Sequence, residues 1–435
     1  MKQKSKFLIF ISFLLMNFTL MFVRSFTGLN IFGFRIGEFY IGFSLLVFLY
    51  ILIYPVTKKS SFFLIDNKLS IVLAILLFLF VISIIDLNNL TINPYFFRTS
   101  SYIWSIAFFY LGSRFYKNSF YDKYLIYSFS FLIIFIYILL VIYRPEILSN
   151  FFLNFSDKYE LHKGADVILI FVLFSSLFFK KIQDSRFYLF FLIIVIGFYM
   201  PLILAVSRTG TVAAVLLVLL NLKRFKFLIK DRVRLFITGL LLIVSLNTSL
   251  YFIANSSIFL DDVIKTELSF KDLVDFRDKF NDDPWLEKGA ISFLFVNDSR
   301  LYSGDGNLNW RLQIWQDVIF DLNNQTSTFL FGYGYKEIIP AMTLDIERRG
   351  HDGLNENVHN YIINILARGG LVQVFLILYL NLLILKMYFS KHGNYNILIY
   401  MLPLLLVSMF DGAMENAHYP LIYYFFLGRL INIEY

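Results

Sequence analysis

Apolar runs long enough to cross a membrane recur from one end of the chain to the other. A helix of about 20 residues spans the hydrocarbon core of a bilayer, and a spanning helix satisfies all of its own backbone hydrogen bonds. Of the 435 residues, 58% are hydrophobic, whereas a soluble protein is closer to about 45–50% apolar. The sequence therefore predicts an all-α integral membrane protein with many spans.

Twelve candidate spans can be marked along the chain, and the first is expected to stay in the mature protein. Lys2, Lys4 and Lys6 precede it, but no small-residue cleavage site follows. The twelve predicted spans are 7–23, 36–54, 69–87, 95–112, 124–143, 166–179, 187–206, 211–222, 235–253, 369–389, 397–410 and 420–433.

The basic residues orient these spans. Lysine and arginine concentrate in alternate connecting segments, such as KKIQDSR and KRFKFLIKDRVR, when the N-terminus is placed inside. This is the positive-inside pattern of membrane proteins. Removing one span would move a basic segment to the wrong side, so we expect both termini to be cytoplasmic. The +8 net charge thus reflects topology and predicts no nucleic-acid partner.

Three parts of the chain follow from this topology. Residues 1–253 are predicted to form nine spans, residues 254–357 a large extracytoplasmic loop, and residues 358–435 a re-entry helix with the last three spans. Within the loop, apolar spacing predicts a helix over 308–320, with Trp310, Ile314 and Val318 on one face. The two glycines of the segment 331–337 (FGYGYKE) predict a tight turn.

Several kinds of chemistry find no support in the sequence. The chain has no cysteine, which excludes thiol nucleophiles and cysteine metal sites. It has no HExxH motif and no Walker A loop, and no extracytoplasmic segment carries Asp-x-Asp. Of the remaining histidines, His392 is predicted to be cytoplasmic, and His162, His351 and His418 extracytoplasmic, with no helical pair among them. We expect no metal and no cofactor.

A histidine stands where the large loop returns to the membrane. The segment 357–378 (NVHNYIINILARGGLVQVFLIL) opens with His359 and Asn360 and continues as an apolar run. Imidazole suits proton transfer near neutral pH, so His359 is a candidate general base. The alternative is a helix cap or an interfacial side chain. Glu356 and Asp352 lie near enough in sequence to share or replace the role of base.

Three arginines are candidate anion ligands, because guanidinium binds phosphate in a bidentate way. Arg208 lies in a short extracytoplasmic SRTG hairpin, where the alternative is a residue that anchors a helix end. Arg311 lies on the predicted loop helix, where the alternative is an exposed residue that neutralises Asp317 or a neighbour. Arg368 is either an interfacial anchor or a third phosphate ligand. Arg348 and Arg349 are weaker candidates, since a pair of loop arginines is usually solvated.

Together these segments resemble one family. SRTG (207–210), NWRLQIW (309–315), FGYGY (331–335) and NVHNYIINILARGGLVQV (357–374) occur in the order and topology of the O-antigen ligase and O-unit polymerase superfamily. The resemblance covers roughly residues 190 to 390. It implies a fold similar to that of metal-independent membrane glycosyltransferases.

The resemblance also implies a reaction. The donor would be a glycan on undecaprenyl diphosphate at the outer face of the bacterial cytoplasmic (inner) membrane. Arg208 and Arg311 would bind the diphosphate, and His359 would activate an acceptor hydroxyl. Aromatic side chains would stack on sugars, with candidates at Trp310, Trp315, Tyr333 and Tyr335, and Asn360 and Arg368 complete the predicted binding set.

Four functions remain open. A polymerase would join repeat units and predicts a chain-length regulator as partner; a ligase would transfer the glycan to lipid A-core and predicts none. We favour the polymerase, because glycan polymerases occur in more kinds of bacteria. A flippase for lipid-linked sugars would need charges in mid-span and repeat symmetry, which the sequence lacks. A non-catalytic assembly or sensor protein gives no reason for Arg208, Arg311 and His359.

Overall fold

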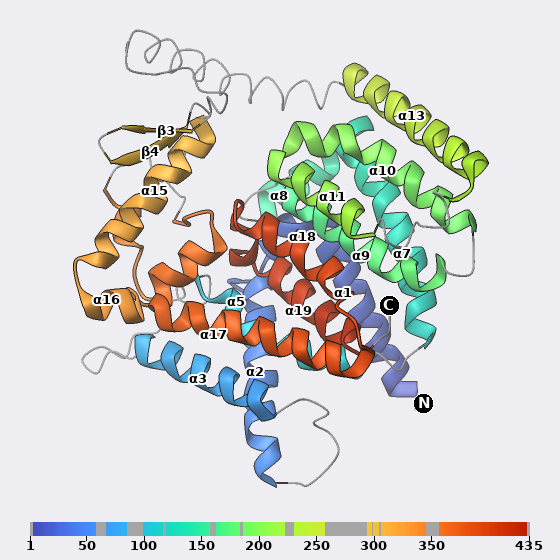
Figure 1. Ribbon diagram of the computed structural model, residues 1–435. Coiled ribbons are helices and arrows are strands. Elements are labelled where there is room, and N and C mark those ends of the chain that lie inside the picture. The colour runs from blue at the N-terminus through green and yellow to red at the C-terminus, as the bar shows by residue number, and fades with distance from the viewer. Residues whose placement is uncertain are drawn as a thin grey trace. The chain divides into compact units, whose positions relative to one another are not determined.

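The computed structural model is mostly helical over the part of the chain that it describes (Figure 1). The described residues are 3–57, 67–84, 99–115, 119–156, 162–182, 186–221, 230–256, 294–297, 299–303, 306–344 and 356–432. They confirm the expected all-α architecture, apart from two short antiparallel hairpins.

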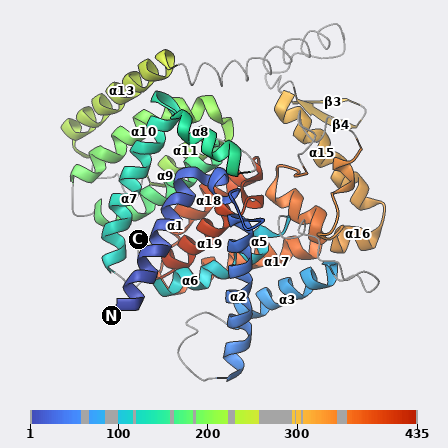
Figure 2. The ribbon, with the colours of Figure 1, turned by 180° about the vertical axis from the view of Figure 1, so that it is seen from behind.

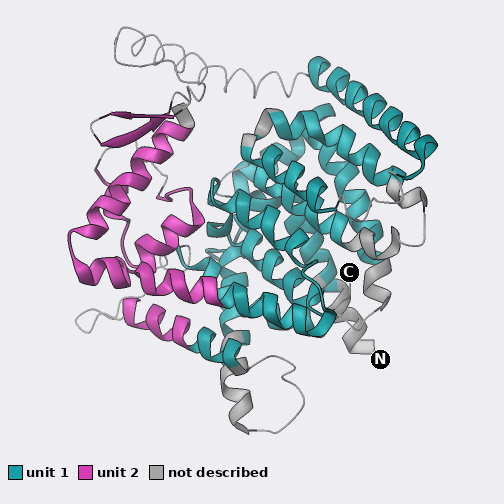
Figure 3. Ribbon diagram, viewed as in Figure 1, with its two compact units in different colours: residues 1–74, 97–256, 380–435 teal, residues 75–96, 257–379 magenta. Residues whose placement is uncertain are grey.

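The chain forms two compact units (Figure 3). Unit 1 consists of residues 1–74, 97–256 and 380–435, and unit 2 of residues 75–96 and 257–379. Helices α3 (Asn67–Ile84) and α17 (Tyr361–His392) each run from one unit into the other. The predicted division at residues 253 and 357 concerns the two sides of a membrane, and it stays a prediction.

Unit 1 is built from helices that pack along their lengths. Its elements are α1 (Gln3–Thr27), α2 (Ile36–Thr57), α5 (Ser101–Trp104), α6 (Ala107–Phe115), α7 (Ser119–Tyr137) with a π-helical end (Ile138–Ile142), α8 (Glu146–Phe155), α9 (Gly164–Ile182), α10 (Arg186–Val206), α11 (Arg208–Asn221), α13 (Arg232–Asn255), α18 (Leu398–Ser408), a 3₁₀ turn (Gly412–Glu415) and α19 (His418–Leu430), with a hairpin of β1 (Asn30–Ile31) and β2 (Phe34–Arg35). Both ribbon views place α13 beside α10 (Figure 2).

Helix α19 lies at the core of unit 1. Most of its residues are buried, including Tyr423 and Arg429. It packs against α6 backbone to backbone: a Cβ added to Gly428 would lie 1.9 Å from the main-chain oxygen of Phe109. Small residues allow helices in membranes to approach this closely. Helix α19, which begins at His418, is therefore closely packed within the unit.

Every predicted span overlaps a helix, and among the described residues three helices are long and apolar enough to cross a membrane by length and composition. These are Tyr124–Ile142, Arg232–Asn255 and Tyr361–His392. Further apolar helices among the described residues are shorter, from 10 to 17 residues. Twelve crossings with both ends cytoplasmic therefore remain a prediction.

One predicted loop contains a helix. The segment 144–165, which connects the predicted spans 124–143 and 166–179, contains α8 at Glu146–Phe155. Its helix is only ten residues long and has polar Ser149, Asn150 and Asn154 among its apolar residues. That length and composition fall short of a span, so the apolar pattern predicts no membrane crossing there.

Unit 2 contains the candidate site. Helix α15 (Gly306–Asn323) confirms the helix predicted over 308–320 and extends it at both ends. Beside it lie β3 (Leu294–Asn297), β4 (Arg300–Ser303), α16 (Thr326–Phe331), a 3₁₀ turn (Pro340–Met342) and the first part of α17. The core of the unit is formed by Ile314, Val318, Leu322, Ile339, Ala341, Met342, Val358 and Ala367.

The hairpin of unit 2 is tied to α15 by side chains. Gln316 accepts a hydrogen bond from the main-chain nitrogen of Leu301 and donates one to its oxygen, both at 2.7 Å. Arg300 pairs with Asp317. The alternative in which Arg311 neutralises Asp317 or a neighbour stays a prediction. Helix α15 thus forms the frame on which the rest of the unit is arranged.

Candidate functional site

His359 lies in a left-handed backbone conformation just before α17. Its φ is 54°, a region that non-glycine residues seldom occupy and that is common at functional sites. The helix cap is Asn360 rather than His359: the Asn360 side-chain oxygen accepts a hydrogen bond from the main-chain nitrogen of Ile363 at 3.0 Å. The half-buried imidazole therefore projects from a sharp turn fixed by its neighbour.

Two tryptophans of α15 contact the turn that carries His359. The Trp310 ring lies 5.2 Å from the His359 ring, at an angle of 55°. The indole nitrogen of Trp315 donates a hydrogen bond to the main-chain oxygen of Val358 at 2.6 Å. Trp310 thus covers one side of the imidazole, and Trp315 holds the backbone that presents it.

Arg311 follows Trp310 on α15 and is partly buried. It belongs to the same helix as both tryptophans, and that helix contacts His359 through Trp310. Arg208 lies in unit 1, where it is the first residue of α11. The structure thus brings Arg311, Trp310 and His359 together in unit 2 and places the backbone of Arg208 in the other unit.

Arg368 is buried, with 1% of its surface exposed. Its guanidinium donates to the main-chain oxygen of Glu337, and to that of Gly334 at 3.4 Å. The sequence suggested an interfacial anchor or a phosphate ligand, and neither role predicts these contacts with main-chain oxygens. They favour a structural role for Arg368, since they attach the segment 334–337 to α17.

The predicted turn at 331–337 is confirmed, and it packs against a break in α17. Gly332 and Gly334 have φ values of 73° and 79°. The main-chain nitrogens of Tyr333 and Gly334 donate to the oxygens of Ala367 and Arg368, at 2.8 and 2.9 Å. The helix is interrupted there at Gly370, whose φ is 66°. The turn therefore uses carbonyl groups at the break in α17.

The aromatic residues of this turn have different environments. Tyr333 is partly exposed, and burial raises the pKa of its phenol, with the charge of Asp321 adding to the effect. Tyr335 is buried, donates to the Gln373 side chain at 2.6 Å and packs on Phe80. The expectation that Tyr335 stacks on sugars is therefore wrong, because its ring is covered by protein.

Some predicted residues lie outside the described part of the chain. These are Arg348, Arg349, His351 and Asp352. Glu356 is described and is half-buried. No group of three or more metal-ligating side chains is found among the residues that the structure describes.

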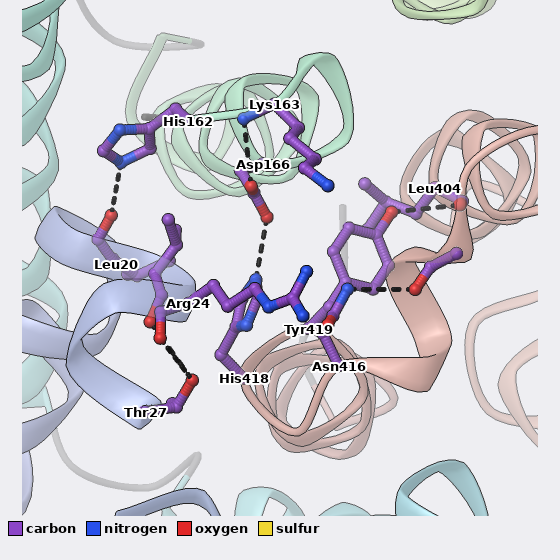
Figure 4. A network of polar contacts seen from close by, with 12 residues as sticks. Leu20, Arg24, Thr27, His162, Lys163, Asp166, Leu404, Asn416, His418 and Tyr419 are labelled. Carbon is purple, nitrogen blue, oxygen red and sulfur yellow. Dashed lines mark hydrogen bonds and ion pairs between the residues drawn. The ribbon is translucent and has the colours of Figure 1, made fainter. Parts of the chain in front are cut away.

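A buried polar cluster in unit 1 was not predicted from the sequence (Figure 4). His418 donates to the carboxylate of Asp166 at 2.8 Å, and the Nε2 of His162 lies 3.0 Å from the main-chain oxygen of Leu20. His418 and Asp166 are 252 positions apart in the sequence, so no local sequence pattern could predict their contact. The available signal was Asp166 itself, an acidic residue at the start of an apolar run.

Comparison with known proteins agrees with these features. A family model described as O-antigen ligase matches residues 164–378. This match places the chain in the O-antigen ligase and polymerase superfamily. The matched region includes Arg208, α15 and the turn at His359. A search of curated proteins found no match.

Membership in this family gives the general activity. The chain is a membrane glycosyltransferase-type enzyme whose family acts on a lipid-linked glycan and an acceptor. Its apolar helices agree with a place in a membrane.

Proposed function

We propose that the enzyme transfers a glycan from undecaprenyl diphosphate to an acceptor sugar hydroxyl at the outer face of the bacterial cytoplasmic membrane. The acceptor is another lipid-linked glycan, so the reaction polymerises repeat units of an O-antigen or capsule. The observation that carries the proposal is the contact between His359, in its left-handed turn, and Trp310, which precedes Arg311 on α15.

His359 acts as the general base in this reaction. The acceptor oxygen attacks the anomeric carbon while its proton passes to the imidazole. The bond between that carbon and the diphosphate oxygen breaks, and the electron pair leaves with the lipid diphosphate. Direct displacement inverts the anomeric centre. A positioned general base contributes about 10²–10⁴-fold to such a rate, and Glu356 or Asp352 would take the role if His359 does not.

Arg208 and Arg311 bind the diphosphate and stabilise the negative charge that grows on it as it leaves. Fixed cations in a poorly hydrated site provide this stabilisation without a metal ion. Trp310, with Tyr333, is proposed to stack on the sugars. Trp315, Asn360 and Arg368 act through the backbone that they hold.

The topology completes the proposal. Twelve spans place both termini in the cytoplasm and residues 254–357 outside. The Arg208 segment and the turn at His359 then lie at the same face of the membrane, where the lipid-linked donor is presented. A chain-length regulator is the protein partner that a polymerase would need.

A ligase is the second candidate, favoured by the family description O-antigen ligase. It would use the same donor and the same residues, and lipid A-core would be the acceptor. The two functions differ in the intermediate that accumulates when the enzyme fails. Single repeat units on the lipid indicate a polymerase, and long chains on the lipid indicate a ligase.

The test uses His359→Ala, Arg208→Ala and Arg311→Ala in the native host. Membrane abundance is measured by blot, and the surface glycan and the lipid-linked pool are separated on gels. His392→Ala is the matched control, since the His392 ring contacts a carbonyl in unit 1. Loss of mature glycan at normal abundance in the three variants supports the proposal. Normal glycan in all three rejects it and leaves the flippase as the hypothesis to examine.

A further inference from the structure

The start of helix α9 is held by two buried polar contacts in unit 1. Asp166, in the first turn of α9, is 6% exposed, and its partner His418 is 2% exposed. His162, two residues before α9, is also buried, and its Nε2 contacts the main-chain oxygen of Leu20 in α1. The beginning of α9 is therefore attached to α19 on one side and to α1 on the other (Figure 4).

Both oxygens of the Asp166 carboxylate are used. One accepts from the Nε2–H of His418 at 2.8 Å, and the other accepts from the main-chain N–H of Lys163 at 3.1 Å. Figure 4 also shows the Arg24 side chain running past His418 toward Tyr419. Buried ion pairs seldom add net stability compared with apolar residues of similar size. The Asp166–His418 pair lies among apolar helices, where such pairs usually serve function rather than stability.

The start of α9, at Gly164, packs against Ser207, the residue that precedes Arg208. A Cβ added to Gly164 would lie 2.1 Å from the Cβ of Ser207 and 2.7 Å from its hydroxyl oxygen. Any larger residue at position 164 would collide with the Ser207 side chain, so glycine is needed for this close contact. The position of Ser207 therefore depends on where α9 begins.

Ser207 in turn fixes the start of α11. Its hydroxyl accepts a hydrogen bond from the main-chain N–H of Gly210 at 3.0 Å, and its carbonyl accepts one from Thr211 at 3.0 Å. This is the cap of the helix whose first residue is Arg208. A continuous path of contacts thus leads from His418 through Asp166 and Gly164 to the residue before Arg208.

We infer that Asp166 and His418 are positioning residues for the Arg208 segment. Their hydrogen bond sets the place of α9, and α9 sets the place of Ser207 and of the backbone of Arg208. The inference rests on the proposed function in one respect only, that Arg208 binds the donor diphosphate. That Asp166 and His418 hold the segment 207–210 in place does not depend on diphosphate binding by Arg208.

The absence of cysteine allows a direct measurement of this positioning. Thr209→Cys places a single thiol on the half-buried second residue of α11. Its rate of reaction with a membrane-impermeant maleimide reports how often the segment opens. Asn150→Cys, on an exposed position of α8, is the reference thiol. Each is combined with His418→Phe, which removes the hydrogen bond, and with His418→Gln, which keeps an N–H donor.

We expect His418→Phe to speed labelling at position 209 by about tenfold, which corresponds to about 1.4 kcal/mol of opening. Labelling at position 150 should not change. His418→Gln should restore the slow rate, because an amide N–H can also donate to Asp166. Gly164→Ala should speed labelling as well, since its methyl group displaces Ser207 directly. An unchanged rate at position 209 in His418→Phe, at normal membrane abundance, overturns the inference.

Glycan transfer separates this inference from the proposed function. If the pair acts through Arg208, then His418→Phe lowers transfer in the otherwise native chain but adds little to the loss caused by Arg208→Lys. Fully additive losses contradict positioning. If Arg208→Ala makes normal glycan, the proposed function fails, while the labelling result still decides whether Asp166 and His418 hold the segment.

Discussion

The indole nitrogen of Trp315 donates to the main-chain oxygen of Val358 at 2.6 Å, one residue before His359. Val358 itself is fully buried in the core of unit 2. The bond therefore connects the frame helix α15 to the turn that carries the candidate base. It crosses 43 residues of chain, so the turn is held by tertiary contact as well as by its own cap.

Replacing Trp315 with Phe tests this connection. The ring is largely kept, but the Val358 oxygen loses its donor, and leaving a buried carbonyl without one costs about 1–3 kcal/mol. Trp104→Phe is the matched control, because the Trp104 indole donates to the Ser100 hydroxyl at 2.8 Å in unit 1. We expect similar losses of thermal stability in detergent, but a clear loss of glycan transfer only in Trp315→Phe. Equal transfer by the two variants would mean that the Trp315 bond serves stability alone.

The break in α17 gives a second prediction, for Gly370→Ala. Gly370 has φ 66° and ψ −172°, a region nearly restricted to glycine, and an added Cβ would lie 2.2 Å from the Leu330 oxygen. Gly393 has a similar φ of 65° but nothing within 4 Å of such a Cβ. Gly393→Ala therefore measures backbone strain alone, at about 1–2 kcal/mol. Gly370→Ala should lower the thermal midpoint further, and an equal shift in both variants would show that the turn at 331–337 moves aside freely.

The parts of the fold that local patterns specify could be predicted from the sequence. Apolar spacing located α15, glycines located the turn at 331–337, and the polar pair His359 and Asn360 before an apolar run located the start of α17 at Tyr361 to within two residues. Each of these signals lies within a few residues, and each reflects a backbone preference that acts locally.

The contacts that could not be predicted join distant residues. Asp166 and His418 meet only because α9 and α19 pack together. The burial of Arg368 depends on the carbonyl groups of a turn about thirty residues earlier. A charged side chain is ordinarily exposed, so its sequence neighbours gave no reason to place it in a core. Every residue has a main-chain oxygen, so the residue types at the acceptor positions could not indicate these hydrogen bonds of Arg368.

His162 predicts how stability depends on pH. Burial lowers the pKa of its imidazole below the usual value of 6.5, against opposing effects of the Asp166 charge and the Leu20 carbonyl, while His418 lowers it further. The unfolded chain therefore binds more protons than the folded chain near and below that value. Stability from this group is complete above about pH 6.5 and is lost as pH falls toward the lower folded pKa. The thermal midpoint should thus fall on acidification, and fall less steeply in His162→Gln, whose side chain does not titrate; parallel pH profiles would contradict the assignment.

Arg368 and Arg311 should respond differently to the same substitution. Arg368→Met leaves the carbonyl groups of Glu337 and Gly334 without their guanidinium donor inside the protein. Each buried carbonyl group left without a donor costs about 1–3 kcal/mol, so we expect a strong fall in membrane abundance. Arg311 is only partly buried, and its proposed task is to bind diphosphate. Arg311→Met should therefore keep near-normal abundance on a blot and lose glycan transfer. If Arg368→Met instead accumulates normally and fails only in transfer, then Arg368 contacts the substrate, and the phosphate-ligand role offered by the sequence is restored.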